Sequence, residues 1–179
     1  MIRHLRNAEI DRQKWDRAVT GWTSQPYGLS WWLDVVSPGW EALVKGDYEA
    51  VMPLPVKKRY GLRYLVQPRF CQQLGVFGTN ETADFLKEVP YLSYDINLNS
   101  KNLFAGQNFR EHVNYIIYKA ACQDSNTSRN IRKADKLVAY QETTPEDFMG
   151  LWRAVNRHFG DVYANLLENL ITECRKRGM

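Results

Sequence analysis

The sequence predicts an α/β or α+β fold in which helices flank a mixed, largely antiparallel sheet. Two observations lead to this prediction: apolar residues at a period of two run through the middle of the chain, and apolar residues at helical spacing dominate both ends. The chain has 179 residues, of which 44% are hydrophobic and 25% are charged. This is the composition of a soluble globular protein that can bury a substantial core.

Two helices are predicted before the first strand. Asn7 is a typical N-cap residue, and acidic residues follow it in the first turn of a helix over 8–18. A second helix is predicted over 29–37, because the Pro-Gly pair at 38–39 would end it.

The period then changes to two, which predicts a β-hairpin. The segments WEALVK and YEAVMPLPVKKRY flank a Gly-Asp turn, and LRYLVQP adds a further strand after another glycine turn. Pro53 and Pro55 lie two positions apart, so both remove an N–H group from the same edge of their strand. We therefore expect this strand to lie at a sheet edge or to splay from its neighbour.

Later segments alternate between helix and strand. We expect a helix over 81–89, strands over 91–99 and 137–141, and a further strand at the end of the segment 109–118. The strand over 91–99 would present one apolar face, formed by Leu92, Tyr94, Ile96 and Leu98.

Two amphipathic helices are predicted at the C-terminal end. Thr144 and Pro145 form a strong helix start, and the apolar spacing continues to Phe159. Asp161 would cap the last helix, and Gly178 would end it. No strand follows these helices, so their apolar faces must cover the earlier sheet, a partner subunit or something outside this chain.

Charge and cysteine content exclude several classes of protein. A net charge of +4 and a pI of about 8.9 fit anionic ligands but do not indicate a duplex DNA partner. Three scattered cysteines without a CxxC pair, and three scattered histidines, support neither a metal site nor a disulfide framework. The N-terminal segment is charged and no apolar run could span a bilayer, so we expect a cytoplasmic protein without a transmembrane segment. We also expect no tightly bound cofactor.

The segment SNTSRNIRKADKL, residues 125–137, is predicted to be a helix with a cationic face. Four cations at positions i, i+3, i+4 and i+7 would share one side of the helix: Arg129, Arg132, Lys133 and Lys136. This face is either a solvated surface or a binding site for a phosphorylated or nucleotide-linked small molecule, because arginine can hold phosphate with two hydrogen bonds.

The segment QQLGVFG, residues 72–78, is a second candidate for ligand binding. Gln72 and Gly75 match a loop that holds the pyrophosphate of acyl-CoA through backbone amides, although Phe77 stands where a small residue is needed. A strand with a glycine bulge is the alternative. Gln72 and Gln73 are the candidate contacts in this segment.

An aromatic group surrounds the short polar loop between the first two predicted helices. Its members are Trp22, Tyr27, Trp31 and Trp32. These rings either pack in the core or form the wall of a site for a sugar, a peptide or a nucleobase. We take Tyr27 and Trp31 as candidate substrate contacts.

Three stretches together resemble the FemAB/FemX-like branch of the GNAT acyltransferase superfamily, and within it members of the Bacteroidetes type. They are MPLPVKKRYGLRYLVQPRFCQQLGVFG, the HVNYIIY segment, and SNTSRNIRKADK followed by a capped helix. The resemblance implies GNAT-like domains in tandem and an acyl donor that is acyl-CoA or aminoacyl-tRNA. It also implies transfer of an acyl or aminoacyl group to a nucleotide-linked cell-wall precursor, whose phosphates Arg129, Arg132 and Lys133 would contact.

On this basis, residues 1–108 form a first GNAT-like domain. Residues 109–179 supply a linking strand, the basic helix and the opening helices of an incomplete second GNAT-like domain. The chain would then be a fragment or the product of a shortened gene, inactive alone, and either a homo-oligomer or dependent on a missing C-terminal domain. The alternative is a non-catalytic module that binds a nucleotide-linked or RNA ligand, tRNA included.

Overall fold

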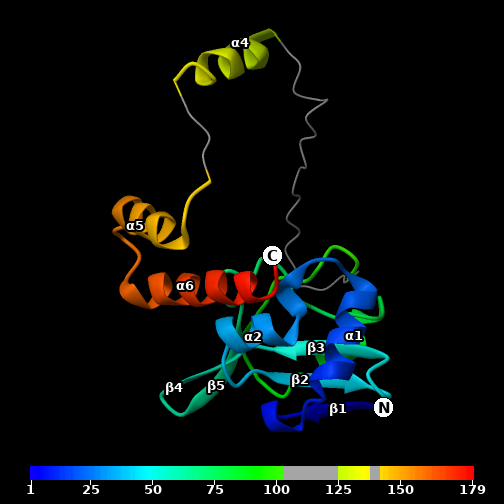
Figure 1. The fold of residues 1–179 in the computed structure, drawn as a ribbon. Helices are drawn as coiled ribbons and strands as arrows, with labels where there is room; N and C mark the ends of the chain where they lie inside the picture. The colour runs from blue at the N-terminus through cyan, green and yellow to red at the C-terminus, as the bar shows by residue number, and fades with distance from the viewer. Residues whose placement is uncertain (103–124, 138–141) are drawn as a thin grey trace. The chain divides into compact units, whose positions relative to one another are not determined.

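Figure 1 shows the computed structural model, which describes residues 1–102, 125–137 and 142–179. The chain divides into two compact units. The first unit combines Met1–Ala105 with Asn156–Met179, and the second unit is Gly106–Val155. The last helix of the chain is therefore grouped with the N-terminal part.

The helices and strands described in the first unit are β1 (Ile2–Leu5), η1 (Asn7–Glu9), α1 (Arg12–Trp22), η2 (Pro26–Gly28), α2 (Ser30–Val36), β2 (Glu41–Lys45), β3 (Ala50–Leu54), β4 (Val56–Arg59), β5 (Leu62–Val66), α3 (Thr82–Lys87), β6 (Tyr94–Asp95) and α6 (Asp161–Lys176). Those described in the second unit are α4 (Ser125–Ala134) and α5 (Pro145–Val155).

The strands of the first unit form two three-stranded sheets instead of the single sheet that we predicted. The first sheet has the order β1-β2-β3 and is antiparallel throughout, with β2 and β3 joined by the predicted hairpin. The second sheet has the order β4-β5-β6, in which β4 and β5 are antiparallel and β5 and β6 are parallel. The mixed α+β class with mostly antiparallel pairing is confirmed for the described residues.

The two prolines explain why there are two sheets. The backbone N–H of Val51 in β3 donates to the carbonyl oxygen of Phe77 at 2.9 Å, and the N–H of Phe77 donates to the carbonyl oxygen of Val51 at 2.8 Å. Both hydrogen bonds lie on the edge of β3 that faces away from β2. Pro53 and Pro55 face that same edge and have no N–H group, so the pairing cannot continue past one bridge. The chain leaves the first sheet at Pro55 and enters the second with β4. Of the two alternatives, the edge position is confirmed, because β3 is the last strand of the first sheet and stays paired with β2 along its whole length.

The first sheet carries an apolar layer on each face, because β2 and β3 are apolar at nearly every position. The layer toward α1 and α2 contains Trp15, Val19, Leu33, Trp40, Ala42, Val44 and Val51. The layer toward β5 and α3 contains Leu43, Ala50, Met52, Leu54, Leu65 and Phe85. Neighbouring residues of one strand thus serve opposite layers, as a period of two requires.

The N-terminal segment differs from our prediction. The expected helix over 8–18 begins only at Arg12, because Asp11 is the N-cap and accepts hydrogen bonds from two backbone N–H groups of the first turn. Asn7 instead donates its side-chain amide to the carbonyl oxygen of Trp40, at 2.9 Å. The strand β1, which we did not predict, pairs with β2.

The prediction of a strand over 91–99 is also largely wrong. Only Tyr94–Asp95 forms a strand, and Leu92 and Tyr94 are exposed instead of facing the core. The backbone of this segment does bond to its neighbours, since Leu74 donates to Asn97, but it does so at separated points. The strand predicted within 109–118 lies outside the described residues, and so does the strand predicted over 137–141 except for Leu137, which lies in a turn.

The C-terminal helices α5 and α6 form where we predicted them, with small differences in their first or last residues. Thr144 accepts a hydrogen bond from the backbone N–H of Asp147 at 3.1 Å, as its predicted role at the start of α5 requires. This helix ends at Val155, so Phe159 lies outside it. Gly160, not Asp161, is the N-cap of α6. Gly178 has a φ of +68°, which suits a glycine after the end of a helix.

The last helix has a partner within the first unit, where α6 packs against α2. Its residues Ala164 and Leu170 are buried. On α5, in contrast, Phe148, Leu151 and Val155 remain exposed. None of the helices within the described ranges is long and apolar enough to cross a membrane.

Candidate functional site

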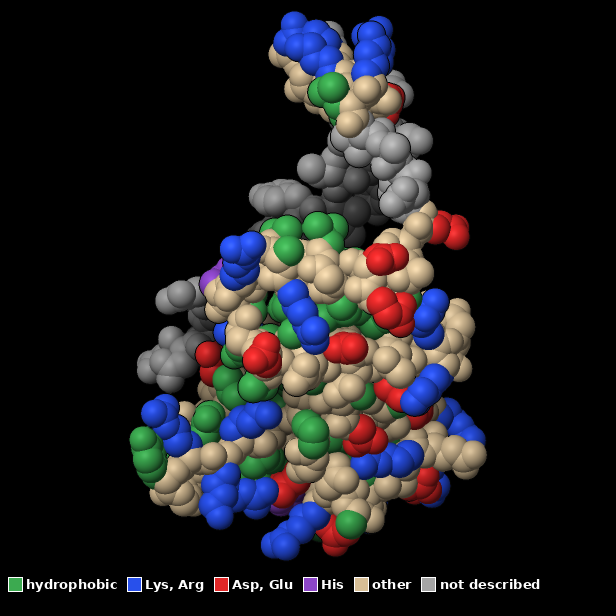
Figure 2. Space-filling model, turned by 60° about the vertical axis from the view of Figure 1, so that its left-hand side comes forward, with side chains coloured by type: hydrophobic (Ala, Val, Ile, Leu, Met, Phe, Trp, Pro, Cys, Tyr) green, Lys and Arg blue, Asp and Glu red, His purple; other side chains and the backbone are tan. Residues whose placement is uncertain are grey.

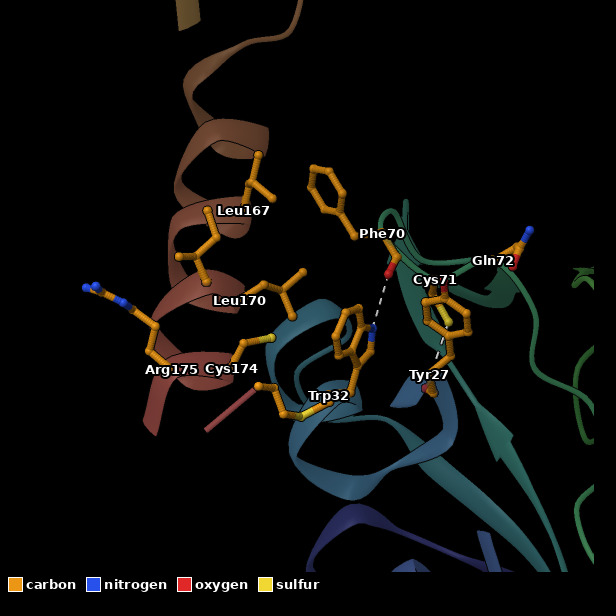
Figure 3. A pocket seen from close by; sticks show the side chains of 11 residues that line it. Tyr27, Trp32, Phe70, Cys71, Gln72, Leu167, Leu170, Cys174 and Arg175 are labelled. Carbon is orange, nitrogen blue, oxygen red and sulfur yellow. Dashed lines mark hydrogen bonds between the residues drawn. The ribbon is translucent and has the colours of Figure 1, made fainter. Parts of the chain in front are cut away.

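An open groove of about 680 Å³ lies in the first unit, between α6 on one side and the α2 region with the loop after β5 on the other. Figure 3 shows this groove from close by. It is lined by Tyr27, Trp32, Phe70, Cys71, Gln72, Leu167, Leu170, Ile171, Cys174, Arg175 and Met179. Its volume is in the range of small-molecule sites.

One wall of the groove is a set of mutually supported aromatic rings. Tyr27 and Trp32 meet edge to face, with ring centroids 5.5 Å apart. The indole N–H of Trp32 donates to the carbonyl oxygen of Phe70 at 3.1 Å. Phe70 itself has a φ of +57°, which is uncommon for a bulky residue. These contacts fix the loop after β5 against α2, so the wall is formed before any ligand binds.

The opposite wall is aliphatic and comes from α6. In Figure 3, Leu167, Leu170 and Cys174 point toward Phe70 and Trp32, whereas the guanidinium of Arg175 points away from them. The interior of the groove is therefore suited to an uncharged, apolar group, and its charged residue lies at the rim.

Two cysteines line the groove in different environments. Cys71 is buried, and burial raises the pKa of its thiol to about 12. Cys174 is half-buried. Because the thiolate is the reactive form, Cys71 is protected from modification by both its burial and its protonation.

We expect a maleimide at pH 8 to modify Cys174 in the folded protein and Cys71 only after unfolding. A Cys122→Ser background removes the third cysteine. In that background Cys174→Ser should abolish labelling of the folded protein, whereas Cys71→Ser should leave its extent unchanged. Mass spectrometry of the labelled protein measures both, and rapid labelling of Cys71 in the native state would contradict this account of the groove.

The candidate residues of the N-terminal half are only partly brought together. Tyr27 and Gln72 both line the groove. Trp31 does not; it packs edge to face on Trp32, with centroids 5.3 Å apart, and lies under the guanidinium of Arg177 at 4.4 Å. Gln73 does not line the groove either, although its carbonyl oxygen is 3.8 Å from the sulfur of Cys71.

Three backbone amides of the segment 72–78 are engaged within the fold. The backbone N–H of Leu74 donates to Asn97 at 2.7 Å, and that of Phe77 donates to Val51 at 2.8 Å. The N–H of Val76 donates to the side chain of Asn102 at 2.7 Å. The segment instead forms single bridges at Leu74 and Phe77 around a glycine with a φ of +87°. An acyl-CoA loop at this position is therefore not supported.

Helix α4 carries the predicted cationic face in the second unit. Arg129, Arg132 and Lys133 lie within the helix and Lys136 lies in the turn after it, and all four are exposed. Figure 2 shows these cationic side chains on α4, at the top of the view. No salt bridge is formed by any of them within the parts of the chain that the structure describes.

A buried carboxylate, Glu41, joins the two sheets of the first unit. One carboxylate oxygen is 2.7 Å from Nε2 of His4 and accepts a hydrogen bond from the hydroxyl of Tyr91 at 2.5 Å. The other oxygen accepts from Arg63. Burial opposes the ionisation of Glu41, but the hydrogen bonds from Tyr91, Arg63 and His4 outweigh it and leave the pKa of Glu41 lowered.

The sequence contains a weak signal for this cluster that we did not use. Glu41 lies two positions before Leu43 in β2, so the two side chains share one face of the strand. An acid on the inward face of an apolar strand needs partners. Burial and the hydrogen bond to Glu41 in turn raise the pKa of Tyr91 to about 12, so this hydroxyl stays protonated.

Among the described residues, no group of three or more His, Cys, Asp or Glu side chains is placed to hold a metal ion. Comparisons of the chain with protein-family models, with curated proteins and with solved structures found no match.

Proposed function

We propose that the chain is part of an acyl- or aminoacyltransferase of the FemAB-like branch of the GNAT superfamily. In this proposal the acceptor is a nucleotide-linked cell-wall precursor, and α4 contacts its phosphates. The proposal is supported by the three quoted sequence stretches and is compatible with the mixed α+β fold. The observation that carries it is the exposed cationic face of α4.

Two arginines one helical turn apart suit a diphosphate. Arg129 and Arg132 are separated by three positions, so they lie on the same side of the helix. The Nε of Arg132 donates to the backbone carbonyl of Ser128 at 3.3 Å, which leaves the terminal nitrogens of its guanidinium for a ligand. Lys133 and Lys136 add charge without fixed geometry.

The chemistry of this proposal is the attack of an amine on an activated acyl carbon. It depends on the positioning of the two substrates and on stabilisation of the oxyanion. The amides of Leu74, Val76 and Phe77 are already engaged, so they do not hold the pyrophosphate of acyl-CoA. This favours aminoacyl-tRNA over acyl-CoA as the donor.

We expect the double variant Arg129→Ala with Arg132→Ala to bind a UDP-linked cell-wall precursor at least tenfold more weakly at low salt. Isothermal titration calorimetry measures this. The variant Arg129→Lys with Arg132→Lys should lose part of the affinity, because lysine keeps the charge but not the paired hydrogen bonds. Lys57→Ala with Lys58→Ala removes the same charge from β4 and should have no effect. Unchanged affinity after removal of the two arginines would refute the phosphate role.

The second candidate function is a non-catalytic module that binds a nucleotide-linked or RNA ligand. The engaged amides of Leu74, Val76 and Phe77 favour it, because the segment that most resembles a donor site has another structural role. Binding of the precursor by the full-length product of the gene, without any acyl transfer from aminoacyl-tRNA, would support this module over the transferase.

A further inference from the structure

The hairpin of β4 and β5 lies in the most cationic stretch of the chain. Residues 50–80 contain five Lys and Arg residues and no Asp or Glu. Three of these cations lie together on β4: Lys57, Lys58 and Arg59. All three are exposed, and none of them forms a salt bridge within the described part of the chain.

The tip of this hairpin exposes two large apolar side chains. Tyr60 is 89% exposed and Leu62 is 74% exposed. They flank Gly61, and Tyr60 and Gly61 have φ values of +50° and +82°. A two-residue turn with positive φ at both positions strongly favours Asn-Gly, so the sequence places a tyrosine here against its backbone preference. Strain of this kind in an exposed residue points to a role outside the fold.

The strand register determines which side chains of the hairpin share a face. Arg59 pairs with Leu62 and Lys57 pairs with Tyr64, so these four side chains share one face. Arg59 also lies over the ring of Tyr60, at 5.1 Å. The cations are thus placed directly behind an apolar tip. This is the arrangement of a segment that enters the boundary of a lipid bilayer while its cations bind the headgroups.

The hairpin is tied to the first sheet by a residue close to its turn. Arg63 of β5 binds the buried carboxylate of Glu41 in the first sheet. The tip can therefore enter a surface without unfolding the strands behind it.

We propose that the β4–β5 hairpin binds the surface of an anionic lipid bilayer, with Tyr60 and Leu62 entering the headgroup boundary and Lys57, Lys58 and Arg59 contacting lipid phosphates. A lipid surface fits better than a single-stranded nucleic acid for two reasons. Leu62 has no aromatic face on which a base could stack, and the guanidinium of Arg59 already covers the ring of Tyr60. This inference does not depend on the proposed transferase function.

The experiment is co-sedimentation of the whole chain with vesicles of phosphatidylcholine containing 30% phosphatidylserine, and with vesicles of phosphatidylcholine alone. We expect binding to the anionic vesicles only, and weaker binding in 0.5 M salt. Replacing Lys57, Lys58 and Arg59 by Ala should lower the partition coefficient about fivefold for each cation removed.

The tip is tested by Tyr60→Asn with Leu62→Ser. Asparagine suits the turn, so this variant should fold at least as well as the wild type but lose more than tenfold in vesicle binding. Leu92→Ser removes a different exposed leucine, outside the hairpin, and should leave vesicle binding unchanged. The proposal is overturned by equal binding to both kinds of vesicle, by full binding of the tip variant, or by binding of single-stranded RNA with no binding of vesicles.

Discussion

Replacing Gly78 by alanine is expected to lower the free energy of unfolding by about 3–5 kcal/mol, since steric overlap and backbone strain act together. An added Cβ would lie 2.3 Å from the carbonyl oxygen of Glu49 and 3.0 Å from the Cα of Ala50. These backbone atoms belong to the first residue of β3 and the residue before it, and they cannot move without disturbing the first sheet. Gly78 also has a φ of +97°, which alanine rarely adopts.

Substitutions at two other glycines distinguish the effect of steric overlap from that of backbone strain. Gly61 has a φ of +82° but open space around it, so Gly61→Ala should cost only the strain, about 1 kcal/mol. Gly21 lies in α1 with open space and an ordinary backbone conformation, so Gly21→Ala should be neutral or stabilise by up to about 1 kcal/mol. Urea denaturation of the three variants measures the series. A loss at Gly78 no larger than that at Gly61 would show that residue 78 is not packed against β3.

Replacing Glu41 by glutamine is expected to destabilise the protein by about 2–3 kcal/mol near pH 7. Glutamine keeps the shape but presents an N–H group where the carboxylate accepted hydrogen bonds from His4, Arg63 and Tyr91. The side chains of Arg63 and His4 are 42% and 34% exposed, so water can solvate them after the substitution. The loss of stability is therefore smaller than the loss expected when a fully buried ion pair is broken.

The exposed pair of Lys45 and Glu81 provides the control, since both side chains are more than a third exposed. Glu81→Gln should change stability by less than about 1 kcal/mol. Chemical denaturation followed by tryptophan fluorescence measures both variants. An equal effect of Glu41→Gln and Glu81→Gln would mean that the cluster does not join the two sheets.

The contribution of Glu41 should also depend on pH. Its folded pKa lies below the usual value of 4.5, so its stabilising effect is complete above pH 4.5 and is lost as the pH falls through the folded pKa. Glutamine does not titrate, and the difference in stability between the wild type and Glu41→Gln should therefore shrink below pH 4.5. A difference that stays constant down to pH 3 would be inconsistent with an ionised Glu41 in the folded protein.

The features that could be predicted from the sequence are those set by local chemistry. Pro53 and Pro55 remove donors wherever their strand lies, so the edge position followed from two residues alone. Thr144 and Pro145 define a helix start by their own conformational preferences. The start of α1 was missed because Asn7 and Asp11 are both good caps, and the choice was made by a distant contact, the bond from Asn7 to Trp40.

The candidate site was predictable only in part, because it too depends on contacts between residues that are distant in the sequence. Tyr27 and Gln72 line one groove, but nothing in their local sequence shows that the two loops meet. Trp31 and Trp32 are neighbours in α2, so their side chains point in different directions, and the sequence does not say which ring faces the groove. The Glu41 cluster combines four segments of the chain, and only the tertiary structure brings them together.

The paired prolines have a consequence for the behaviour of this protein at high concentration. The outer edge of β3 is the place where a strand from another molecule would add, because a free row of N–H and C=O groups is a template for aggregation. With no amide hydrogens at Pro53 and Pro55, that row is interrupted beyond Val51. The same residues that divide one sheet into two thereby discourage strand addition from a second copy of the chain.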